Sequence, residues 1–472
     1  MRIVLLAAIV FAVCLGSQSA FAANAAVDKD GMAVVDGKRV FIVGLYENPK
    51  DDADLARVAE SGFNLVRSSE STEALDRLHK HGLWAWINTG YSIDLSADTD
   101  NRTQQLKDMA ENYGAHPALA VWEVPDEALW NCWYGPLCWR TGDEPKAQAE
   151  AIDALDDKEL AQELGKQRHE VQRLHGEGFY AEAEQLADAI WVKLGKESPK
   201  PSYGVATSAE RASKMGEGMS AGYEALKELD PNHPIWMNHA PRNQIAQLAA
   251  FNEGADAVGC DIYPIPRSPR NGHSDLADRS MASVGAYTDR MQAAAPGKPV
   301  WMVLQGFGWD DLAKGEEIEE HLRKPRPTFD ETRFMAYDAI VHGARAILYW
   351  GSAYIEKDSQ LWEDLLKIAA ELDALQPVLS APDAALDLSL EYAETFGSLD
   401  HGVRVLPKNV GATVWLIVVN ESVYPLTYTM RGFQYADGTR YADETTGREA
   451  VVSQGALTLT ISSQSVQVLA PK

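Results

Sequence analysis

The chain lacks what nucleic-acid binding or membrane spanning would need. It has 43 Lys and Arg against 69 Asp and Glu, a net charge of −26, and so acidic a chain repels phosphate backbones and anionic lipid surfaces. After the first 22 residues, no apolar run approaches the roughly 20 residues of a membrane-spanning helix. We therefore expect no nucleic-acid partner and no membrane insertion of the mature chain. Neutral sugar polymers suffer no such repulsion, although the charge also serves simply to keep an exported protein soluble.

Cysteine is also scarce, with 4 in 472 residues. Cys132 and Cys138 lie in the segment NCWYGPLCW, and their spacing predicts a disulfide in an oxidising compartment. The chain-entropy model assigns so short a loop roughly 2 kcal/mol. A zinc site is the alternative, but no matching pair of histidines lies nearby. Cys260 lies in an apolar stretch and is expected to be a buried free thiol.

The N-terminus has the pattern of an export signal. Arg2 is followed by an apolar run from Ile3 to Leu15, and Ala20-Phe21-Ala22 is a small-residue cleavage motif. We expect a signal peptide over residues 1–22 that is removed on export. The mature protein is then periplasmic or secreted.

The middle of the chain alternates short apolar runs with amphipathic helical stretches. Near-continuous hydrophobicity is typical of parallel strands covered on both faces, and eight such units with short links predict a closed (β/α)8 barrel over residues 39–382. The runs are RVFIVGLYE (39–47), NLVRSS (64–69), LWAWINTG (83–90), LAVWEVPDE (119–127), PIWMNHAP (234–241), AVGCDIYP (257–264), PVWMVLQGFGW (299–309) and ARAILYWGSAY (344–354).

Three further segments surround this barrel. Residues 23–38 contain a turn dipeptide between apolar residues and predict an N-terminal cap or hairpin. Residues 130–205 interrupt the pattern after strand 4 with two long amphipathic helices, expected at about 146–175 and 179–196. They form either a lid or spacer or, because such insertions emerge on the active-site face, a wall of the substrate site. Residues 383–472 change to period-two alternation and predict a small antiparallel β-sandwich.

A barrel places its working residues at the C-terminal ends of its strands. Those ends are rich in acids, aromatic rings and amides, and they lack a phosphate-binding glycine loop, a nucleophile elbow and histidines at metal-ligand spacing. We therefore expect neither a cofactor nor a metal. Two carboxyls with flat aromatic rings suit glycosidic bond cleavage and sugar binding. The candidates at the strand ends are Tyr46, Glu47, Arg67, Asn88, Asp126, Glu127, His239, Asp261, Tyr263, Gln305, Trp309 and Trp350.

Some of these residues also carry a family resemblance. VWEVPDEAL resembles the strand-4 motif of clan A glycoside hydrolases, W-E-x-x-N-E-P, which implies that Glu127 is the acid/base. Asp126 stands where the family has an Asn that contacts the sugar 2-hydroxyl. Arg67 is similar to the strand-2 Arg of the clan and Trp350 to its strand-8 Trp platform. The C-terminal sandwich also looks like the accessory domains common there, and the specific likeness is confined to strands 4, 7 and 8.

The resemblance fails where the clan carries its nucleophile, a Glu at the end of strand 7. This chain has Gln305 there, in WMVLQGFGW, and an amide can neither form a glycosyl ester nor act as a base. Asp261 is the first choice for the second carboxylate and Glu47 the second. Glu123 is an even number of residues from Glu127 and so is expected to point to the same side of the strand, but deeper in the barrel. This position indicates a buried structural acid paired with Arg67 or a backbone donor.

The sequence thus predicts an exported glycoside hydrolase that acts on a poly- or oligosaccharide. Without a strand-7 carboxylate we expect a wide pair of acids and therefore inversion at the anomeric carbon, with Gln305 orienting water or a sugar hydroxyl. The alternatives are a carbohydrate-binding pseudo-glycosidase that has lost the nucleophile, and another barrel enzyme such as a lyase or transglycosylase. The residues expected to bind sugar are Tyr46, Arg67, Asn88, Asp126, His239, Tyr263, Gln305, Trp309 and Trp350.

Overall fold

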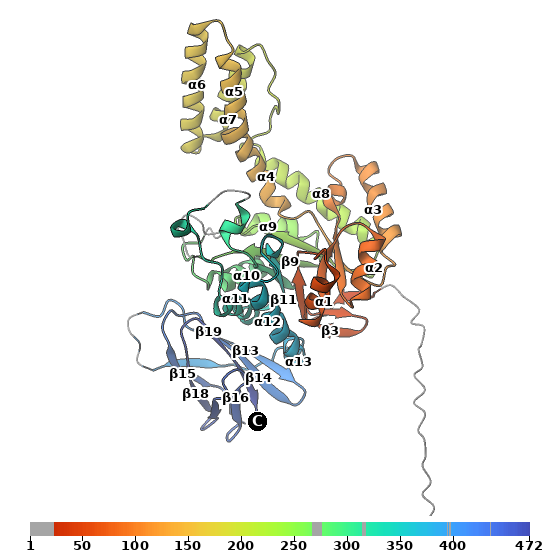
Figure 1. Ribbon diagram of the computed structural model, residues 1–472, viewed down its shortest axis with the longest axis vertical. Helices are drawn as coiled ribbons and strands as arrows, with labels where there is room; N and C mark the ends of the chain where they lie inside the picture. Colours follow the sequence, from red (N-terminus) through yellow and green to blue (C-terminus); the bar gives the residue numbers. More distant parts are fainter. Residues whose placement is uncertain (1–22, 267–275, 314–317, 394, 396–397, 435) are drawn as a thin grey trace, which may run out of the picture.

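The computed structural model describes residues 23–266, 276–313, 318–393, 395, 398–434 and 436–472, so the expected signal peptide lies outside the described residues. Its centre is a closed barrel of eight parallel strands in sequential order (Figure 1). The expected (β/α)8 barrel is therefore confirmed, with one strand in each of the eight apolar runs. The strands are β4 (Ile42–Leu45), β5 (Leu65–Ser68), β6 (Trp84–Asn88), β7 (Leu119–Glu123), β8 (Ile235–His239), β9 (Ala257–Ile262), β10 (Val300–Gln305) and β11 (Ala344–Trp350).

An outer ring of helices covers the barrel, and side chains define several of their starts. Asp51 accepts a hydrogen bond from the Ala53 backbone N–H, and Thr328 forms a capping box with Glu331. In the described chain, no helix is both long and apolar enough to cross a membrane. The outer helices are α1 (Asp52–Glu60), α2 (Thr72–Lys80), α3 (Thr99–Tyr113), α8 (Ser208–Leu229), α9 (Ile245–Asn252), α10 (Ser283–Ala294), α11 (Phe329–Val341), α12 (Gln360–Ala374) and α13 (Gln376–Leu379).

The barrel interior is filled by alternate residues of the strands. Trp86, Trp236 and Trp301 are fully buried there, and the Trp236 ring lies 5.9 Å from that of Trp86 and 5.8 Å from that of Trp301. Gly259 is required beside them, because a Cβ at this position would lie 1.7 Å from the Trp301 carbonyl oxygen. The strands β1 (Ala25–Val27), β2 (Ala33–Val35) and β3 (Lys38–Val40) form a sheet whose Ala25, Ala33 and Val35 belong to the same interior cluster. The N-terminal sheet thus packs against the barrel interior.

The helical insertion after β7 has a small core of its own. It consists of α4 (Ala128–Cys138), a π-helical turn η2 (Trp139–Asp143), α5 (Glu144–Asp153), α6 (Lys158–Gly176) and α7 (Tyr180–Lys193). Figure 1 shows α5, α6 and α7 as a bundle that projects from the barrel at the end of α4. The expected single helix over 146–175 is wrong, because Asp157 caps a new helix by accepting hydrogen bonds from the Glu159 and Leu160 N–H groups.

The expected disulfide between Cys132 and Cys138 is also wrong. Both residues lie in α4 and are free. Six helical residues span about 9 Å, beyond the roughly 6.8 Å that a disulfide allows between Cα atoms. Cys132 is instead buried with its Sγ 3.8 Å from the Met215 Sδ, whereas Cys138 is exposed. The expected burial of Cys260 as a free thiol is confirmed.

The number of reactive thiols tests this correction. In the mature chain, which is expected to begin at residue 23, an aromatic disulfide reagent should modify one thiol quickly while the protein is folded. That thiol belongs to Cys138, which is exposed. Burial raises the pKa of Cys132 to about 11, which leaves little thiolate to react at neutral pH. Full denaturation without reductant should expose three thiols, and Cys138→Ser should remove the fast one. Finding only one reactive thiol after denaturation would show that Cys132 and Cys138 are joined by a disulfide after all.

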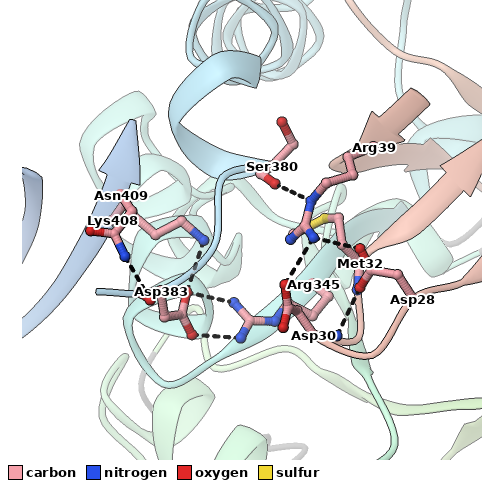
Figure 2. A network of polar contacts seen from close by, with 9 residues as sticks. All are labelled: Asp28, Asp30, Met32, Arg39, Arg345, Ser380, Asp383, Lys408 and Asn409. Carbon is pink, nitrogen blue, oxygen red and sulfur yellow. Dashed lines mark hydrogen bonds and ion pairs between the residues drawn. The ribbon is translucent and has the colours of Figure 1, made fainter. Parts of the chain in front are cut away.

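The C-terminal region forms two antiparallel sheets around a shared core, which confirms the expected sandwich. Figure 2 shows how the sandwich is joined to the barrel: Asp383, in the segment that enters the sandwich, pairs with Arg345 of β11 at 2.6 Å and with Lys408 of β13 at 2.9 Å. In the same network Arg39 of the N-terminal sheet donates to the Ser380 carbonyl. The strands are β12 (Ser389–Tyr392), β15 (Leu426–Arg431) and β18 (Ala456–Ile461) in one sheet, and β13 (Val403–Val410), β14 (Thr413–Asn420), β19 (Ser465–Pro471), β16 (Arg440–Asp443) and β17 (Glu449–Val451) in the other.

Candidate active site

A cavity of about 230 Å³ opens at the C-terminal mouth of the barrel. Carboxyl groups occupy one side of it and aromatic rings the other. Seven of the candidates from the sequence contribute to its wall, and Asn238, Phe307 and Leu312 join them. The lining residues are Tyr46, Asp126, Glu127, Asn238, Asp261, Tyr263, Phe307, Trp309, Leu312 and Trp350.

Glu127 has an unusual backbone where the chain leaves β7 and enters α4. Its φ is +52°, in the left-handed region that non-glycine residues seldom adopt. Its N–H donates to the Asn238 carbonyl at 3.3 Å, which holds the turn against the neighbouring strand. Such a conformation costs roughly 1–3 kcal/mol and is typical of functional sites. The turn directs the Glu127 carboxyl into the cavity mouth.

Glu127 and Asp261 line the same cavity, and each affects the ionisation of the other. Burial, followed by the charge of Asp126, raises the pKa of Glu127 to about 7. Burial, followed by the charge of Glu127, also raises the pKa of Asp261. Two buried neighbouring carboxyls favour a state in which one of them keeps its proton.

Asn238 links the carboxyls and was not among the residues expected to bind substrate. Its Nδ2 donates to Asp126 at 2.8 Å and to Asp261 at 3.2 Å. Burial, followed by the charge of Asp261, raises the pKa of the neighbouring Tyr263. Strand alternation was the signal that could have identified Asn238, because it shares parity with the inward-facing Trp236.

Glu123 lies fully buried below the cavity, as its deeper position suggested. Its carboxylate accepts hydrogen bonds from Tyr46 Oη at 3.3 Å, Trp86 Nε1 at 3.1 Å and Asn88 Nδ2 at 2.8 Å. Arg67 Nε is 4.0 Å away. Burial, followed by the charge of a neighbouring aspartate, raises the pKa of Glu123 to about 7. Glu123 therefore organises the floor of the site through these donors and does not face a ligand.

Three other candidates are engaged outside the cavity. Asn88 uses its amide to hold Glu123 and accepts a hydrogen bond from the Gly90 N–H. Glu47 accepts hydrogen bonds from Ser352 and Lys357 at 2.7 and 2.5 Å. These contacts satisfy both side chains within the protein, and Arg67, directed at Glu123, is likewise absent from the cavity wall. The expected contacts of Asn88 and Arg67 with sugar, and the second choice of Glu47 as a carboxylate, are not supported by these positions.

His239 points away from the barrel interior, contrary to its expected role in sugar binding. Its Nε2 lies 2.8 Å from the Asn252 Oδ1 of α9, and its side chain is buried. Burial lowers the pKa of His239 to about 4, so the ring is neutral. The expected role of His239 in sugar binding failed because His239 directly follows Asn238, and successive residues of a strand face opposite sides of the sheet.

Gln305 is fully buried, and its amide is bonded to backbone. Its Oε1 accepts from the Ile265 N–H at 3.0 Å, while its Nε2 donates to the carbonyls of Ile265 at 2.7 Å and Phe307 at 3.0 Å. The expectation that Gln305 orients water or a sugar hydroxyl is therefore wrong. An amide suits this place because both a donor and an acceptor are required, which a carboxylate cannot supply.

Gln305→Glu, which restores the residue type of the clan, is therefore expected to destabilise the protein and not to improve catalysis. A carboxylate there would face two carbonyl oxygens in a buried site, at a cost of about 3 kcal/mol or more. Denaturant unfolding should reveal the loss, with Gln305→Leu as the control for lost hydrogen bonds without added charge. A variant that matches the wild type in stability and exceeds it in activity would contradict this role for Gln305.

The opposite wall of the cavity is aromatic. The Trp350 ring stacks on Tyr263, with centroids 5.6 Å apart and planes 19° apart. Phe307 packs edge-on against Trp350 and Trp309. Flat aromatic rings of this kind suit the apolar faces of sugars. This wall agrees with the expected placement of Tyr263, Trp309 and Trp350.

Comparison with known proteins identifies the fold. No family model matches the chain, and no curated protein matches it. Among solved structures it is similar to a β-galactosidase from Bacillus circulans sp. alkalophilus, with 11% identity, coverage of 92% of this chain and 99% of that one, and a TM-score of 0.51. A family 5 glycoside hydrolase from Bacteroides vulgatus matches with 12% identity, 94% and 93% coverage and the same score. The barrel and its C-terminal sheets thus have the fold of clan A glycoside hydrolases.

Proposed function

We propose that this protein is an exported glycoside hydrolase that cleaves a poly- or oligosaccharide. The observation that carries the proposal is that Glu127 and Asp261 line one cavity at the barrel mouth together with several aromatic rings. Glycoside hydrolysis requires one carboxyl that donates a proton and a second that attacks or activates water. The fold is shared with glycoside hydrolases, which supports this chemistry, but a shared fold does not by itself establish a function.

The two carboxyls are assigned different tasks by their positions. Burial and the charge of Asp126 raise the pKa of both groups, so the pKa shifts do not separate the tasks. Glu127 stands at the end of β7, where the motif of the clan A glycoside hydrolases that this chain resembles carries the acid/base. We therefore assign Glu127 as the general acid that protonates the leaving oxygen, and Asp261, which accepts a hydrogen bond from Asn238, as the nucleophile.

The position of both carboxyls in one small cavity supports retention of anomeric configuration, in place of the inversion expected from the sequence. A retaining pair stands about 5–5.5 Å apart, whereas an inverting pair needs roughly 6.5–9.5 Å to admit water. We infer that neighbouring carboxyls in so small a cavity take up the smaller spacing. Asp261 then forms a glycosyl ester, which water hydrolyses with Glu127 as the base.

A second aromatic surface extends from the cavity along α4 and suits further sugar units. Trp130 follows Glu127 by one helical turn and stacks on Tyr134 at 5.7 Å, with Arg242 over its ring. A second cavity of about 290 Å³ begins here, and Tyr180 of α7 lines it. The helical insertion thus contributes to the wall of the extended site, the second of its two expected roles.

Trp130→Ala is accordingly expected to lower kcat/KM on long oligosaccharides by roughly tenfold, with a smaller loss on a disaccharide. Truncation removes a stacking surface that contributes about 0.5–1.5 kcal/mol beyond its buried area. Kinetics on a series of chain lengths measure this difference. Tyr424→Ala, at an exposed ring of the sandwich, is the matched control. Equal losses at every chain length would refute a subsite along α4.

The function itself is tested by release of reducing sugar from a panel of neutral polysaccharides. Hydrolysis of at least one is expected, and its rate should depend on Glu127. Binding of a polysaccharide without hydrolysis of any in the panel would refute the enzyme and favour the carbohydrate-binding pseudo-glycosidase. Export is tested by N-terminal sequencing of protein from outside the cytoplasm, which should begin at residue 23.

A further inference from the structure

A cluster of potential metal ligands lies outside the barrel mouth, where α11 meets the C-terminal sandwich. Asp338 and His342 stand four residues apart at the end of α11, and Glu421 follows β14. One ligand atom from each of these three side chains lies within 4.8 Å of the others. The cluster therefore combines one imidazole and two carboxylates from two parts of the fold.

The two nitrogens of His342 have different surroundings. Nε2 faces the cluster and lies 2.7 Å from Glu421 Oε1. Nδ1 lies 2.9 Å from Asp289 of α10, on the other side of the ring. A histidine that binds a metal commonly donates its second N–H to a carboxylate in this manner, which fixes the tautomer and the ring orientation. Asp289 is placed to do so.

Asp338 supplies a separate indication of a missing partner. Its side chain is 0% exposed, and its Oδ2 accepts a hydrogen bond from the Gly285 N–H at 2.7 Å. Its Oδ1 is buried and has no hydrogen-bond partner among the described residues. A buried carboxylate oxygen without a donor or cation costs several kcal/mol. A cation between Asp338, His342 and Glu421 would remove this cost.

A second histidine lies near Glu421 but outside the cluster of three. His401 Nδ1 lies 3.7 Å from Glu421 Oε2, and its Nε2 lies 2.6 Å from Asp278. This repeats the arrangement of His342, with a carboxylate behind the ring. Ligands of a tetrahedral zinc ion stand roughly 3.4 Å apart, given bonds of about 2.0–2.1 Å. The Arg404 guanidinium lies 3.4 Å from the same Glu421 oxygen. It would stay paired with that oxygen when a metal is bound.

We propose that Asp338, His342 and Glu421 bind a zinc ion that ties the barrel to the C-terminal sandwich, with a water molecule completing the coordination. Imidazole and carboxylate together suit zinc, whereas calcium and magnesium prefer sites made of oxygen alone. The ligands lie outside the proposed catalytic cavity, so the site is structural. It does not depend on whether the barrel hydrolyses sugars.

The full mature protein, purified without a histidine tag and treated with chelator, provides the decisive measurement. Titration with ZnCl₂ should show one bound equivalent by calorimetry and by elemental analysis after desalting, and the melting temperature should rise by several degrees. Equal concentrations of CaCl₂ and MgCl₂ should not reproduce the shift. Absence of stoichiometric zinc binding would overturn the proposal and leave the cluster a network of hydrogen bonds and ion pairs.

Asp338→Asn tests the ligand set, since it keeps an acceptor for the Gly285 N–H and removes the charge. Its zinc affinity should fall by tenfold or more, while His321→Gln, which alters an exposed His–Glu contact, should bind zinc like the wild type. Unchanged affinity in Asp338→Asn would refute the assignment. If that variant does not fold, the spectrum of the Co²⁺-loaded wild type decides: intense visible absorption is expected for tetrahedral nitrogen and oxygen ligands, and weak octahedral absorption would overturn the site.

Discussion

Glu127→Gln is expected to fold normally and to lower kcat by 10²- to 10⁴-fold. The amide keeps the size of the side chain and can still donate a hydrogen bond to Asp261, but it cannot give up a proton to the leaving oxygen. A general acid contributes a factor of this magnitude. Steady-state kinetics on a natural polysaccharide measure the loss. The effect should be smaller on an aryl glycoside with a good leaving group, which needs little protonation.

The pH dependence gives a second measure of the same residue. Because burial and Asp126 raise the pKa of Glu127 to about 7, activity should fall as the pH rises through about 7 and the acid is lost. Stability should fall over the same range, because a carboxyl with a raised pKa in the folded state favours folding below its unfolded pKa of about 4.3 and loses this contribution as pH rises through the folded value. In Glu127→Gln the alkaline decline in activity should disappear, and melting should depend less on pH between about 5 and 8.

Glu47→Gln is the matched control for this experiment. Glu47 is also a carboxylate at a strand end, but it is held by Ser352 and Lys357 outside the cavity. Its substitution should leave the alkaline limb of the pH profile in place. Wild-type turnover in Glu127→Gln on a natural substrate would show that the general acid lies elsewhere.

Asp261→Ala is expected to lower kcat by about 10³-fold or more, because the group that forms the glycosyl ester is removed. Azide distinguishes a nucleophile from a base. A small anion that occupies the space of the lost carboxylate should attack an activated aryl glycoside from the same face. The product should then be a glycosyl azide of inverted configuration. Glu127→Ala with azide should instead yield the retained glycosyl azide, because Asp261 still forms the ester.

The wild-type reaction completes the test. Proton NMR of the first product should show the anomeric configuration of the substrate bond. A product of inverted configuration, together with no azide adduct from Asp261→Ala, would assign Asp261 as a base that activates water. Asp126→Asn is a useful companion, since it should lower the pKa of Glu127 and shift the alkaline limb to lower pH without removing either carboxyl.

The barrel was predictable because local patterns carry it. Eight apolar runs, each followed by an amphipathic helix, have few other ways to bury both faces of a parallel sheet. The same rule places strand ends at one mouth, which brought Glu127, Asp261 and Trp350 into one cavity without any knowledge of their distances. Strand parity would also have separated Asn238 from His239, so that error was avoidable from the sequence.

Other features depended on contacts between distant segments. Gln305 occupies the position of the family nucleophile, yet its role follows from the backbone of Ile265, 40 residues earlier. Cys132 and Cys138 are close along the chain, but the continuous helix between them holds them apart. The extra helix start at Asp157 lay within a long charged amphipathic stretch, which resembles one helix because no proline or glycine stands near the break.

The sequence by itself determined the fold class and the strand ends at which the candidate carboxyls lie, because hydrophobic period and chain direction are local properties. Tertiary structure decided between Asp261, the first choice from the sequence, and Glu47, since only Asp261 lines the cavity with Glu127. It also brought Glu421 against Asp338 and His342 from 79 residues away along the chain. Side-chain protonation and ligand geometry depend on burial and on neighbours across the fold, and no spacing within a single segment encodes either.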